Sequence, residues 1–449
     1  MEWLLRTMSG YANRQAMVHG ERVYSYSDIL ATCESWARII REHSIKPGEV
    51  VSLAGDYSPS ACGAVLALLA NRNIIVPLSE SVRHRHDELA ELVQVDRSLA
   101  LDGTNAAVRT YDRRGHTGLL GDFIAEEKPG LILFTSGTTG TPKAILHDFT
   151  VFSERYKTPR DTLRTLTFLL FDHIGGLNTM FHTLANGGTI IAPDNRTAPA
   201  ICALIEKHRI ELLPTSPSFL NLLLMSGAYR GYDLSSLRII TYGTEVMPDS
   251  TLRAAELAFP EVQLRQTYGL SELGILRAKS RASGSPWLTI GGEGVETRIL
   301  DGVLHIRSNT AMRGYLNAPS PFDDQGWFNT QDEVLTDGEY IRILGRRSEI
   351  INVGGRKVYP VEVEDVLLQM PEVADAAVRG EPNPLLGSIV AASVKLHEPL
   401  EPGVLKARMR SFCRGKLEDF QIPVKIEIQQ DELFTERYKK IRKKKPADA

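Results

Sequence analysis

The chain contains 449 residues, too many for one compact hydrophobic core, so two or three domains are expected. Hydrophobic residues make up 43% of the chain and charged residues 24%, a balance that excludes a disordered or fibrous protein. The formal net charge of −3 gives no overall basic field for nucleic acid, and no run of about 18 uncharged apolar residues predicts a membrane span.

The cysteines and the N-terminal residues indicate the cellular compartment in which the protein is expected. No CxxC pair occurs, and no basic stretch followed by an apolar one opens the chain, so neither a zinc site nor a secretory signal is predicted. Isolated cysteines are typical of buried thiols in a reducing compartment, and we therefore expect a cytoplasmic protein. The four residues are Cys33, Cys62, Cys202 and Cys413.

The first half of the chain alternates strand-like and helix-like segments. Apolar strands separated by helices predict an α/β fold with mostly parallel sheets. The strands are expected at residues 49–54, 73–77, 131–134, 189–192 and 211–214, and the helices at 60–71 and 199–208.

Beyond about residue 315 the sequence changes to short alternating segments with Asp-Gly turns, which predict antiparallel hairpins. We place a domain boundary after residue 346, which leaves a small C-terminal domain of residues 347–449. The strands expected in this half are 303–308, 333–335, 340–344, 373–379 and 389–396, and the helices 360–368 and 404–414.

A loop rich in glycine and hydroxyl residues follows the expected strand 131–134. Small residues let backbone N–H groups approach an anion closely, and a lysine at the end adds positive charge. The loop departs from a Walker A sequence, because Pro142 stands where a glycine would precede the lysine. It predicts a phosphate site, with a surface turn as the alternative. Its residues are Thr135, Ser136, Gly137, Thr138, Thr139, Gly140, Thr141, Pro142 and Lys143.

This nonapeptide resembles the signature loop of the adenylate-forming superfamily, which includes acyl-CoA and aryl-CoA ligases, adenylation domains of nonribosomal peptide synthesis and firefly-type luciferases. Further motifs follow in the family's order over roughly residues 20–445. The resemblance implies ATP and Mg²⁺ as cofactors and an ATP-binding role for residues 135–140 and Lys143. It also implies residues 1–346 as a large domain with a small β-barrel-like part, and a mobile α+β domain after it.

The segment Gln-Thr-Tyr-Gly-Leu-Ser-Glu at residues 266–272 resembles the family's Tyr-Gly-x-Thr/Ser-Glu motif. The resemblance implies that Tyr268 stacks on adenine, with Gly269 and Ser271 beside it, and that Glu272 holds Mg²⁺. A flat ring and a hard oxygen ligand suit these two tasks.

Upstream, Gly243, Thr244 and Glu245 resemble the strand-end loop that covers the other adenine face, although an ordinary turn is the alternative. Residues 327–332 resemble the family's Thr-Gly-Asp motif, whose aspartate, here Asp332, accepts hydrogen bonds from the ribose. Gln331 stands where glycine is usual.

Residues 345–358 resemble the family's hinge segment. The resemblance implies that Arg346 also holds the ribose and that Ser348, where Asp or Lys is usual, is the pivot. Gly354 and Gly355 match the turn that lines the thiol tunnel.

The family's C-terminal Thr-x-x-Gly-Lys-Ile-x-Arg segment has only an imperfect counterpart here, since its glycine is missing. Alignment on Ile441 selects Lys440 as the catalytic lysine, whereas counting from Thr435 selects Lys439. We favour Lys440.

Residues 169–177 resemble the family's Phe-His-x-x-Gly segment at the acyl pocket. His173 would lie beside the reacting carboxylate, or it is a satisfied core residue. Asp172 matches the position where amino-acid-activating members hold an α-amine, and Ser218 is expected on another pocket wall.

The resemblance therefore implies ATP-dependent activation of a carboxylic acid through an acyl-adenylate, followed by transfer to a pantetheine thiol. An acyl- or aryl-CoA ligase is favoured. The alternatives are a freestanding enzyme that loads an acyl carrier protein, with an amino or acyl acid, and a nucleotide-binding protein without turnover. Because nine residues follow Lys440, the thiol is expected from outside the chain.

Overall fold

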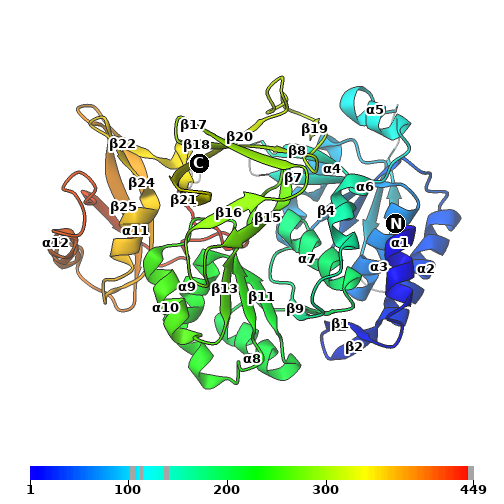
Figure 1. Cartoon of the computed structure of the whole chain (residues 1–449), viewed down its shortest axis with the longest axis horizontal. Helices are drawn as coiled ribbons and strands as arrows, with labels where there is room; N and C mark the ends of the chain where they lie inside the picture. Colours follow the sequence, from blue (N-terminus) through cyan, green and yellow to red (C-terminus); the bar gives the residue numbers. More distant parts are fainter. Residues whose placement is uncertain (102–106, 112–114, 136–140, 443–449) are drawn as a thin grey trace.

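The computed structural model describes residues 1–101, 107–111, 115–135 and 141–442. They form a large N-terminal part and a smaller C-terminal part, which lies at the left of Figure 1. This confirms the predicted α/β fold with one large and one small domain. The exact boundary at residue 346 stays a prediction.

One sheet of the large domain has seven strands in the order β13-β12-β11-β9-β10-β1-β2, all parallel except the β1–β2 hairpin. Because β9, β11, β12 and β13 run the same way, the segments that follow them gather at one sheet edge. The strands are β1 Gln15–His19, β2 Arg22–Ser25, β9 Arg164–Leu166, β10 Thr189–Ala192, β11 Leu212–Thr215, β12 Ile239–Tyr242 and β13 Gln263–Gln266.

A second seven-stranded sheet has the order β19-β8-β7-β4-β3-β5-β6. Its central strands are parallel, and β8 returns antiparallel to β7. The strands are β3 Val50–Ala54, β4 Ile74–Leu78, β5 Arg97–Ala100, β6 Val108–Thr110, β7 Gly130–Thr135, β8 Lys143–Asp148 and β19 Gly314–Tyr315.

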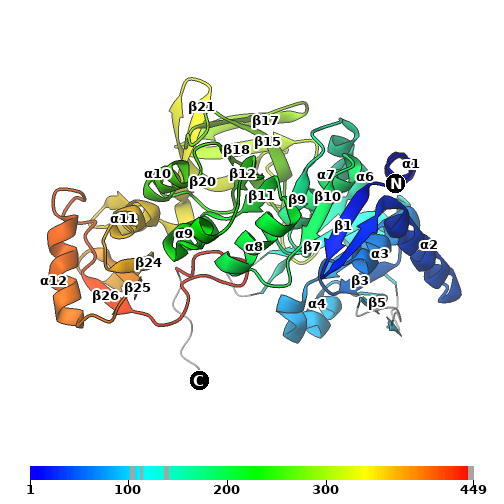
Figure 2. The same ribbon diagram turned by 90° about the horizontal axis from the view of Figure 1, so that it is seen from below.

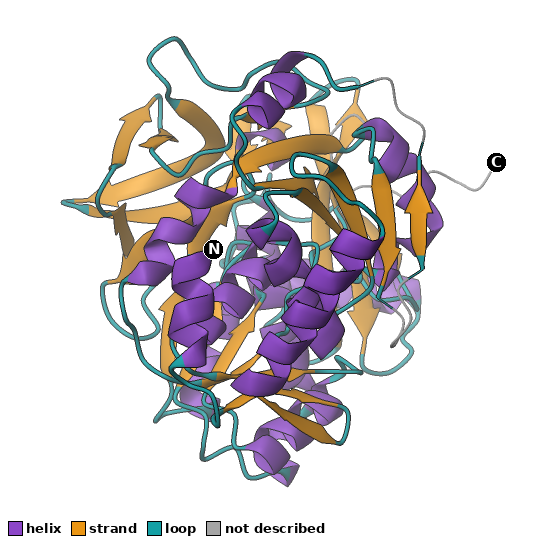
Figure 3. Cartoon of the chain, turned by 90° about the vertical axis from the view of Figure 1, so that its right-hand side faces the viewer, coloured by secondary structure: helices purple, strands orange, loops and turns teal. Residues whose placement is uncertain are grey.

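Helices cover these sheets, as Figure 3 shows from the side of the N-terminal helices. The helix α3 is apolar on every face and is buried over most of its length, which accounts for its Ala/Leu-rich sequence. The α-helices of this domain are α1 Glu2–Ser9, α2 Tyr26–Glu42, α3 Pro59–Ala70, α4 His86–Leu92, α5 Gly118–Ala125, α6 Phe149–Ser153, α7 Ile174–Ala185, α8 Ala198–His208, α9 Pro217–Ser226 and α10 Asp249–Ala258, and the short 3₁₀ turns are η1 Glu80–Arg85, η2 Glu154–Lys157 and η3 Ala228–Gly231.

The predicted hairpins form a third, antiparallel sheet in the order β14-β15-β16-β21-β20-β18-β17. Its strands are β14 Tyr268–Leu270, β15 Gly274–Ser280, β16 Leu288–Gly291, β17 Val295–Leu300, β18 Val303–Ser308, β20 Phe328–Asp337 and β21 Tyr340–Arg346.

The small domain has its own apolar core beneath a five-stranded sheet of order β23-β22-β25-β24, with β26 parallel to β25. After β26 the chain returns to the large domain and passes close to α9, as the red loop in Figure 2 shows. The elements are η4 Arg347–Glu349, β22 Ile351–Val353, β23 Arg356–Val358, α11 Pro360–Leu367, β24 Val373–Asn383, β25 Gly387–Leu396, α12 Pro402–Cys413 and β26 Lys425–Ile428.

All four cysteines are free and buried. Within the described residues, no helix is both long enough and apolar enough to cross a membrane.

Candidate active site

The phosphate loop starts and ends on paired strands. Thr135 closes β7 and Lys143 opens β8, and the two residues are register partners. Asn317 holds the returning chain, since its Oδ1 accepts from the backbone N of Ala144 at 2.9 Å and its Nδ2 donates to the carbonyl of Pro142 at 2.8 Å. The predicted phosphate ligands Ser136, Gly137, Thr138, Thr139 and Gly140 lie outside the described residues.

Tyr315 joins the phosphate lysine to the predicted metal ligand. The Lys143 ammonium lies 4.8 Å from the centre of the Tyr315 ring, whose hydroxyl donates to Glu272 Oε1 at 2.7 Å. Burial and the neighbouring Glu272 carboxylate raise the pKa of Tyr315, so the hydroxyl keeps its proton.

Glu272 fits the predicted Mg²⁺. Among the described residues its second carboxylate oxygen has no hydrogen-bond partner, and Mg²⁺ is commonly held by one or two carboxylates together with substrate phosphates. No group of three His, Cys, Asp or Glu side chains in the described part of the chain could hold a metal alone. The phosphates of ATP would therefore complete the coordination.

The predicted adenine and ribose residues lie together. The Tyr268 hydroxyl donates to Asp332 Oδ2 at 2.6 Å, and Arg346 Nε lies 3.5 Å from Asp332 Oδ1. Burial raises the pKa of Asp332, an effect that the charge of Arg346 opposes. The Asp332 carboxylate thus links Arg346, at the end of β21, to Tyr268, at the start of β14.

Two small residues let the strand ends approach closely. A Cβ on Gly243 would lie 2.5 Å from Thr267 Oγ1, and one on Gly269 would lie 2.7 Å from the Ile275 side chain. Thr244 follows Gly243 with a φ of 72°, a left-handed conformation. The loops beyond β12 and β13 are therefore packed against each other.

Gln331, which stands where glycine is usual, has a φ of 63°, a left-handed conformation that glycine adopts most easily. Asp332 thus keeps its place on β20 although glycine is missing.

The carbonyl oxygen of Ser271 lies 2.7 Å from Nε2 of the buried His147.

Glu245 and Ser218 bind each other. Ser218 Oγ donates to Glu245 Oε2 at 2.6 Å, and Glu245 Oε1 accepts from the backbone N of Lys440. The ATP-binding role of Glu245 and the substrate role of Ser218 stay predictions, since the contacts found for them tie α9 to the C-terminal segment.

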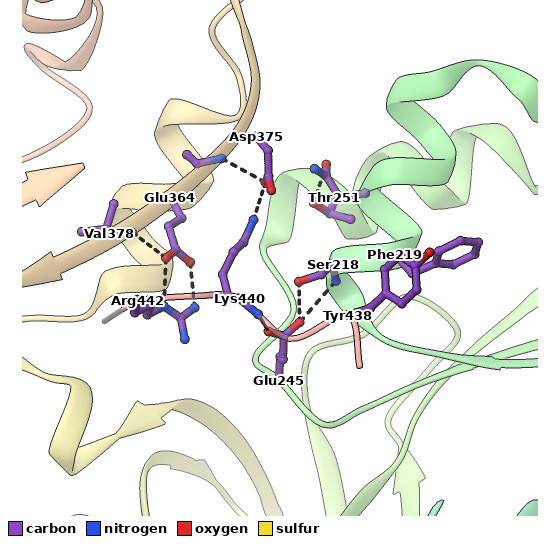
Figure 4. Close-up of polar contacts among 12 residues, drawn as sticks. Ser218, Phe219, Glu245, Thr251, Glu364, Asp375, Val378, Tyr438, Lys440 and Arg442 are labelled. Atoms are coloured by element: carbon purple, nitrogen blue, oxygen red, sulfur yellow. Dashed lines mark hydrogen bonds and ion pairs between the residues drawn. The ribbon is translucent and has the colours of Figure 1, made fainter. Parts of the chain in front are cut away.

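The two candidate lysines point in opposite directions. The Lys440 ammonium pairs with Asp375 of β24, and both side chains are almost fully buried (Figure 4). Lys439 instead lines a cavity of about 10 Å³ together with His173 and Thr244. Lys439 therefore lies beside His173 and Lys440 beside Asp375, and which of the two acts in catalysis stays a prediction.

The backbone turn before Lys439 bears on how the C-terminal segment aligns with the family's motif. Tyr438 has a φ of 51°, a left-handed conformation that glycine adopts most easily, and it stands where the family's motif has glycine. This conformation favours the alignment that counts from Thr435, and the choice between the two alignments stays a prediction. Removal from water lowers the pKa of Lys439, an effect that the Glu245 carboxylate opposes.

His173 is the N-cap of α7. Its Nδ1 accepts from the backbone N of Gly175 at 3.0 Å. Removal from water, together with the positive charges of Lys439 and Arg437, holds the pKa of His173 well below its usual range. A neutral ring that accepts at Nδ1 carries its proton on Nε2 and offers that N–H as a donor.

Asp172 is buried and has protein partners. Its Oδ2 accepts from Ser79 Oγ at 2.9 Å and from Arg437 at 2.8 Å. Asp172 does not appear among the residues that line the cavity beside His173. Its role as a substrate ligand therefore stays a prediction.

The predicted hinge and tunnel residues lie in the small part of the structure. Ser348 is exposed in the single turn η4, between β21 and β22. Gly354 and Gly355 form the β22–β23 turn with φ values of 59° and 84°, as a type I′ hairpin requires. Their hydrogen bonds are to Leu386 and Asn352 of the same domain.

Sequence reasoning missed three contributors to this site: Asn317, Tyr315 and Arg437. Asn317 and Tyr315 reach the phosphate loop only because β19 pairs with β8. Arg437 is one of many basic residues near the end of the chain, and its partner lies 265 positions away. A larger cavity of about 240 Å³, beside Arg342 and Glu362, contains none of the predicted site residues.

Known proteins resemble this chain in sequence and in fold. The family profile described as AMP-binding enzyme matches residues 84–316, more than half of the chain, and the profile of the AMP-binding enzyme C-terminal domain matches residues 362–440. An indoleacetate–CoA ligase from Aromatoleum aromaticum is 26% identical, over 98% of this chain and 96% of its own. A 2-succinylbenzoate–CoA ligase from Bacillus subtilis is 24% identical, over 94% and 93%.

Among solved structures, the anthranilate CoA ligase AuaEII in complex with anthranoyl-AMP has a TM-score of 0.81 at 18% identity, covering 98% of this chain and 95% of that one. At this identity the likeness concerns the fold. Because the family profile spans more than half of the sequence, the chain belongs to the family of AMP-binding enzymes.

Proposed function

We propose that the protein is an AMP-forming acid–thiol ligase, which activates a carboxylic acid as an acyl-adenylate and transfers the acyl group to the pantetheine thiol of CoA. The observation that carries the proposal is the shared cavity of Lys439 and His173, which brings a cation and a neutral donor to one point. The curated relatives named above are CoA ligases, which supports the same reaction class.

In the first step the substrate carboxylate attacks the α-phosphorus of ATP, and pyrophosphate leaves. Lys439 pairs with the carboxylate and the α-phosphate oxygens, and the Nε2–H of His173 donates to the same region. These groups work by alignment and by neutralising charge, the main demands of phosphoryl chemistry.

The other proposed ATP contacts are those that the resemblance to the family implies. Lys143 and the loop 135–140 hold the leaving pyrophosphate, and Asp332 with Arg346 binds the ribose. Glu272 would hold Mg²⁺, which neutralises phosphate charge when bound.

In the second step the thiol attacks the acyl carbon and AMP leaves. We propose that the small domain turns about Ser348, so that Lys439 withdraws and the Gly354–Gly355 turn faces the site. We further propose that the enzyme works in the cytoplasm on a small-molecule acid, without a nucleic-acid partner.

Carboxylate-dependent exchange of labelled pyrophosphate into ATP tests the first step. We would compare acetate, octanoate, benzoate, indole-3-acetate and L-alanine as acids. Exchange with an acyl or aryl acid is expected, and exchange with alanine alone would point to an amino acid substrate. ATP binding without exchange for any of these acids, with Mg²⁺ present, would contradict the proposed activity.

The acceptor is tested separately. The acid that gives the fastest exchange is incubated with ATP and either CoA or an acyl carrier protein bearing phosphopantetheine. Release of acyl-CoA is expected. Acylation of the carrier alone would replace CoA by a carrier protein as the acceptor.

A further inference from the structure

The segment that carries Lys439 is attached to the large domain through an aromatic side chain. The Tyr438 ring lies 5.1 Å from the Phe168 ring and 5.3 Å from the Phe219 ring, measured between centroids. Its hydroxyl donates to the carbonyl of Arg196 at 2.8 Å, and its own carbonyl accepts from Ser216 Oγ at 2.9 Å. Tyr438 therefore inserts among residues of the large domain (Figure 4).

This insertion offsets an unfavourable backbone. A left-handed φ costs free energy for any residue with a Cβ, and glycine would avoid that cost. The chain has tyrosine at this position and gains the aromatic contacts instead. The Tyr438 ring thus makes contacts with the large domain that a glycine at this position could not make.

Arg437 supplies a second, polar attachment. Its guanidinium donates to Asp172 Oδ2 at 2.8 Å, and the Asp172 side chain is only 5% exposed. Loss of one partner of a buried ion pair is strongly unfavourable, because the other charge stays buried. The pair therefore favours the docked segment over any arrangement that withdraws Arg437.

Lys439 follows these two residues directly. Within the described part of the chain its ammonium makes no hydrogen bond, so the backbone on either side sets its position. The backbone N of Lys440 also donates to Glu245 of the large domain. Two side-chain pairs are made to the small domain itself, with Lys440 on Asp375 and Arg442 on Glu364. These pairs can turn with the small domain, whereas those of Arg437 and Tyr438 cannot.

We propose that Arg437 and Tyr438 form a two-point anchor that positions Lys439 for adenylation and must release before thiol transfer. The roles given to this anchor in adenylation and thiol transfer rest on the proposed function. Both are positioning residues, because they act through Lys439. Asp172 and the Phe168/Phe219 pair are the receptors of the anchor on the large domain.

The first test is independent of catalysis. Hydrogen exchange with mass spectrometry on the full chain follows peptides covering residues 433–442 in Tyr438→Gly and Arg437→Gln. Exchange in these peptides is expected to accelerate by about tenfold, since each variant loses an attachment of this segment. Ser44→Gly is the matched control, because Ser44 has the same φ of 51° but is exposed and distant from the site. Unchanged protection of the segment in both anchor variants would overturn the anchor.

The second test separates the two half-reactions. Pyrophosphate exchange with the fastest acid of the panel is expected to fall about 100-fold in Tyr438→Gly, because Lys439 is misplaced. Acyl transfer to CoA from the chemically prepared acyl-adenylate of that acid is expected to stay at the wild-type rate or rise. Equal losses in both half-reactions would overturn the positioning role.

Conservative variants guard against misfolding. Tyr438→Phe keeps the ring and Arg437→Lys keeps the charge, so each is expected to restore most of the exchange activity lost in Tyr438→Gly or Arg437→Gln. Failure of these variants to restore activity would contradict the anchor. If wild-type protein catalyses no exchange, the proposed function fails, while the hydrogen-exchange result still decides whether the anchor exists.

Discussion

At the scale of single residues, two adjacent lysines have separate tasks. The adjacent side chains of Lys439 and Lys440 have different surroundings, and it is Lys439 that lines the cavity beside His173. Lys440 is neutralised by Asp375, and Lys439 lies beside His173. The difference gives a prediction for each lysine.

Lys439→Ala is expected to lower pyrophosphate exchange by about 10²–10³-fold, the usual cost of removing one preorganised charge partner. Transfer from a preformed acyl-adenylate should be spared. Lys440→Ala should lower the urea midpoint, because it leaves Asp375 buried without its partner, but should keep the exchange rate of folded enzyme. The reverse pattern would support the alignment on Ile441, which selects Lys440 as the catalytic lysine.

His147 provides a pH prediction. Burial lowers the pKa of His147 from its usual 6.5 to about 4, so the unfolded chain takes up this proton first as the pH falls. The wild-type protein should therefore lose about 3 kcal/mol of stability from this group between pH 6.5 and pH 4. His147→Gln keeps a donor for the Ser271 carbonyl but does not titrate.

Urea unfolding of both proteins at pH 7 and pH 4.5 measures this contribution. The difference in unfolding free energy between wild type and His147→Gln should move in favour of the variant at the lower pH. A difference that does not depend on pH would contradict a neutral, buried His147.

At the scale of elements, the strand ends of the parallel sheet carry most of the site. Segments after β9, β11, β12 and β13 meet at one edge, and the third sheet contributes Tyr268, Asp332 and Arg346. Close packing of these ends leaves little room for added atoms.

Gly243→Ala tests this packing. The new Cβ would lie 2.5 Å from Thr267 Oγ1 and 2.9 Å from the Thr267 carbonyl, so the strand ends must separate. A loss of about 1–3 kcal/mol in unfolding free energy is expected. Gly231→Ala is the control, since its Cβ would meet nothing within 4 Å. Equal stability of the two variants would show that the strand ends have room for a methyl group.

Much of the element pattern could be predicted from the sequence. Buried strands such as β3, β4 and β10 are short and mostly apolar, and α3 is rich in Ala and Leu, so composition alone suffices. The first hairpin β1–β2 was not predicted, because β1 gains its place by pairing with β10, about 170 positions later.

The same distinction holds for the site. Motif residues such as Glu272, Tyr268 and Asp332 are recognisable because their chemistry is local. Contacts such as Arg437 with Asp172 depend on two domains meeting, which no spacing in the sequence specifies.

At the scale of the whole molecule, the small domain is joined to the large one by β21, η4 and β22 and by the returning segment 433–442. The proposed mechanism uses a change of shape in this connection between its two steps. Ser348 lies exposed at the junction, where a change in backbone angles meets little resistance.

Ser348→Pro tests that movement. A proline fixes φ, so the arrangement with Lys439 in the site should persist while rotation is hindered. Exchange of pyrophosphate is expected to remain close to wild type, and transfer to CoA to fall by about 100-fold. Ser348→Ala, which leaves the backbone free, should behave like wild type. A proline variant that transfers at the normal rate would exclude Ser348 as the pivot.

Burial of the four cysteines also affects the reactivity of their thiols. An acyl-adenylate is a strong electrophile, and a thiolate nearby would capture its acyl group. Burial raises the pKa of Cys33, Cys202 and Cys413 to about 11 and that of Cys62 to about 12, so all four stay protonated at neutral pH. None of the four thiols is therefore expected to compete with the acceptor thiol for the acyl group.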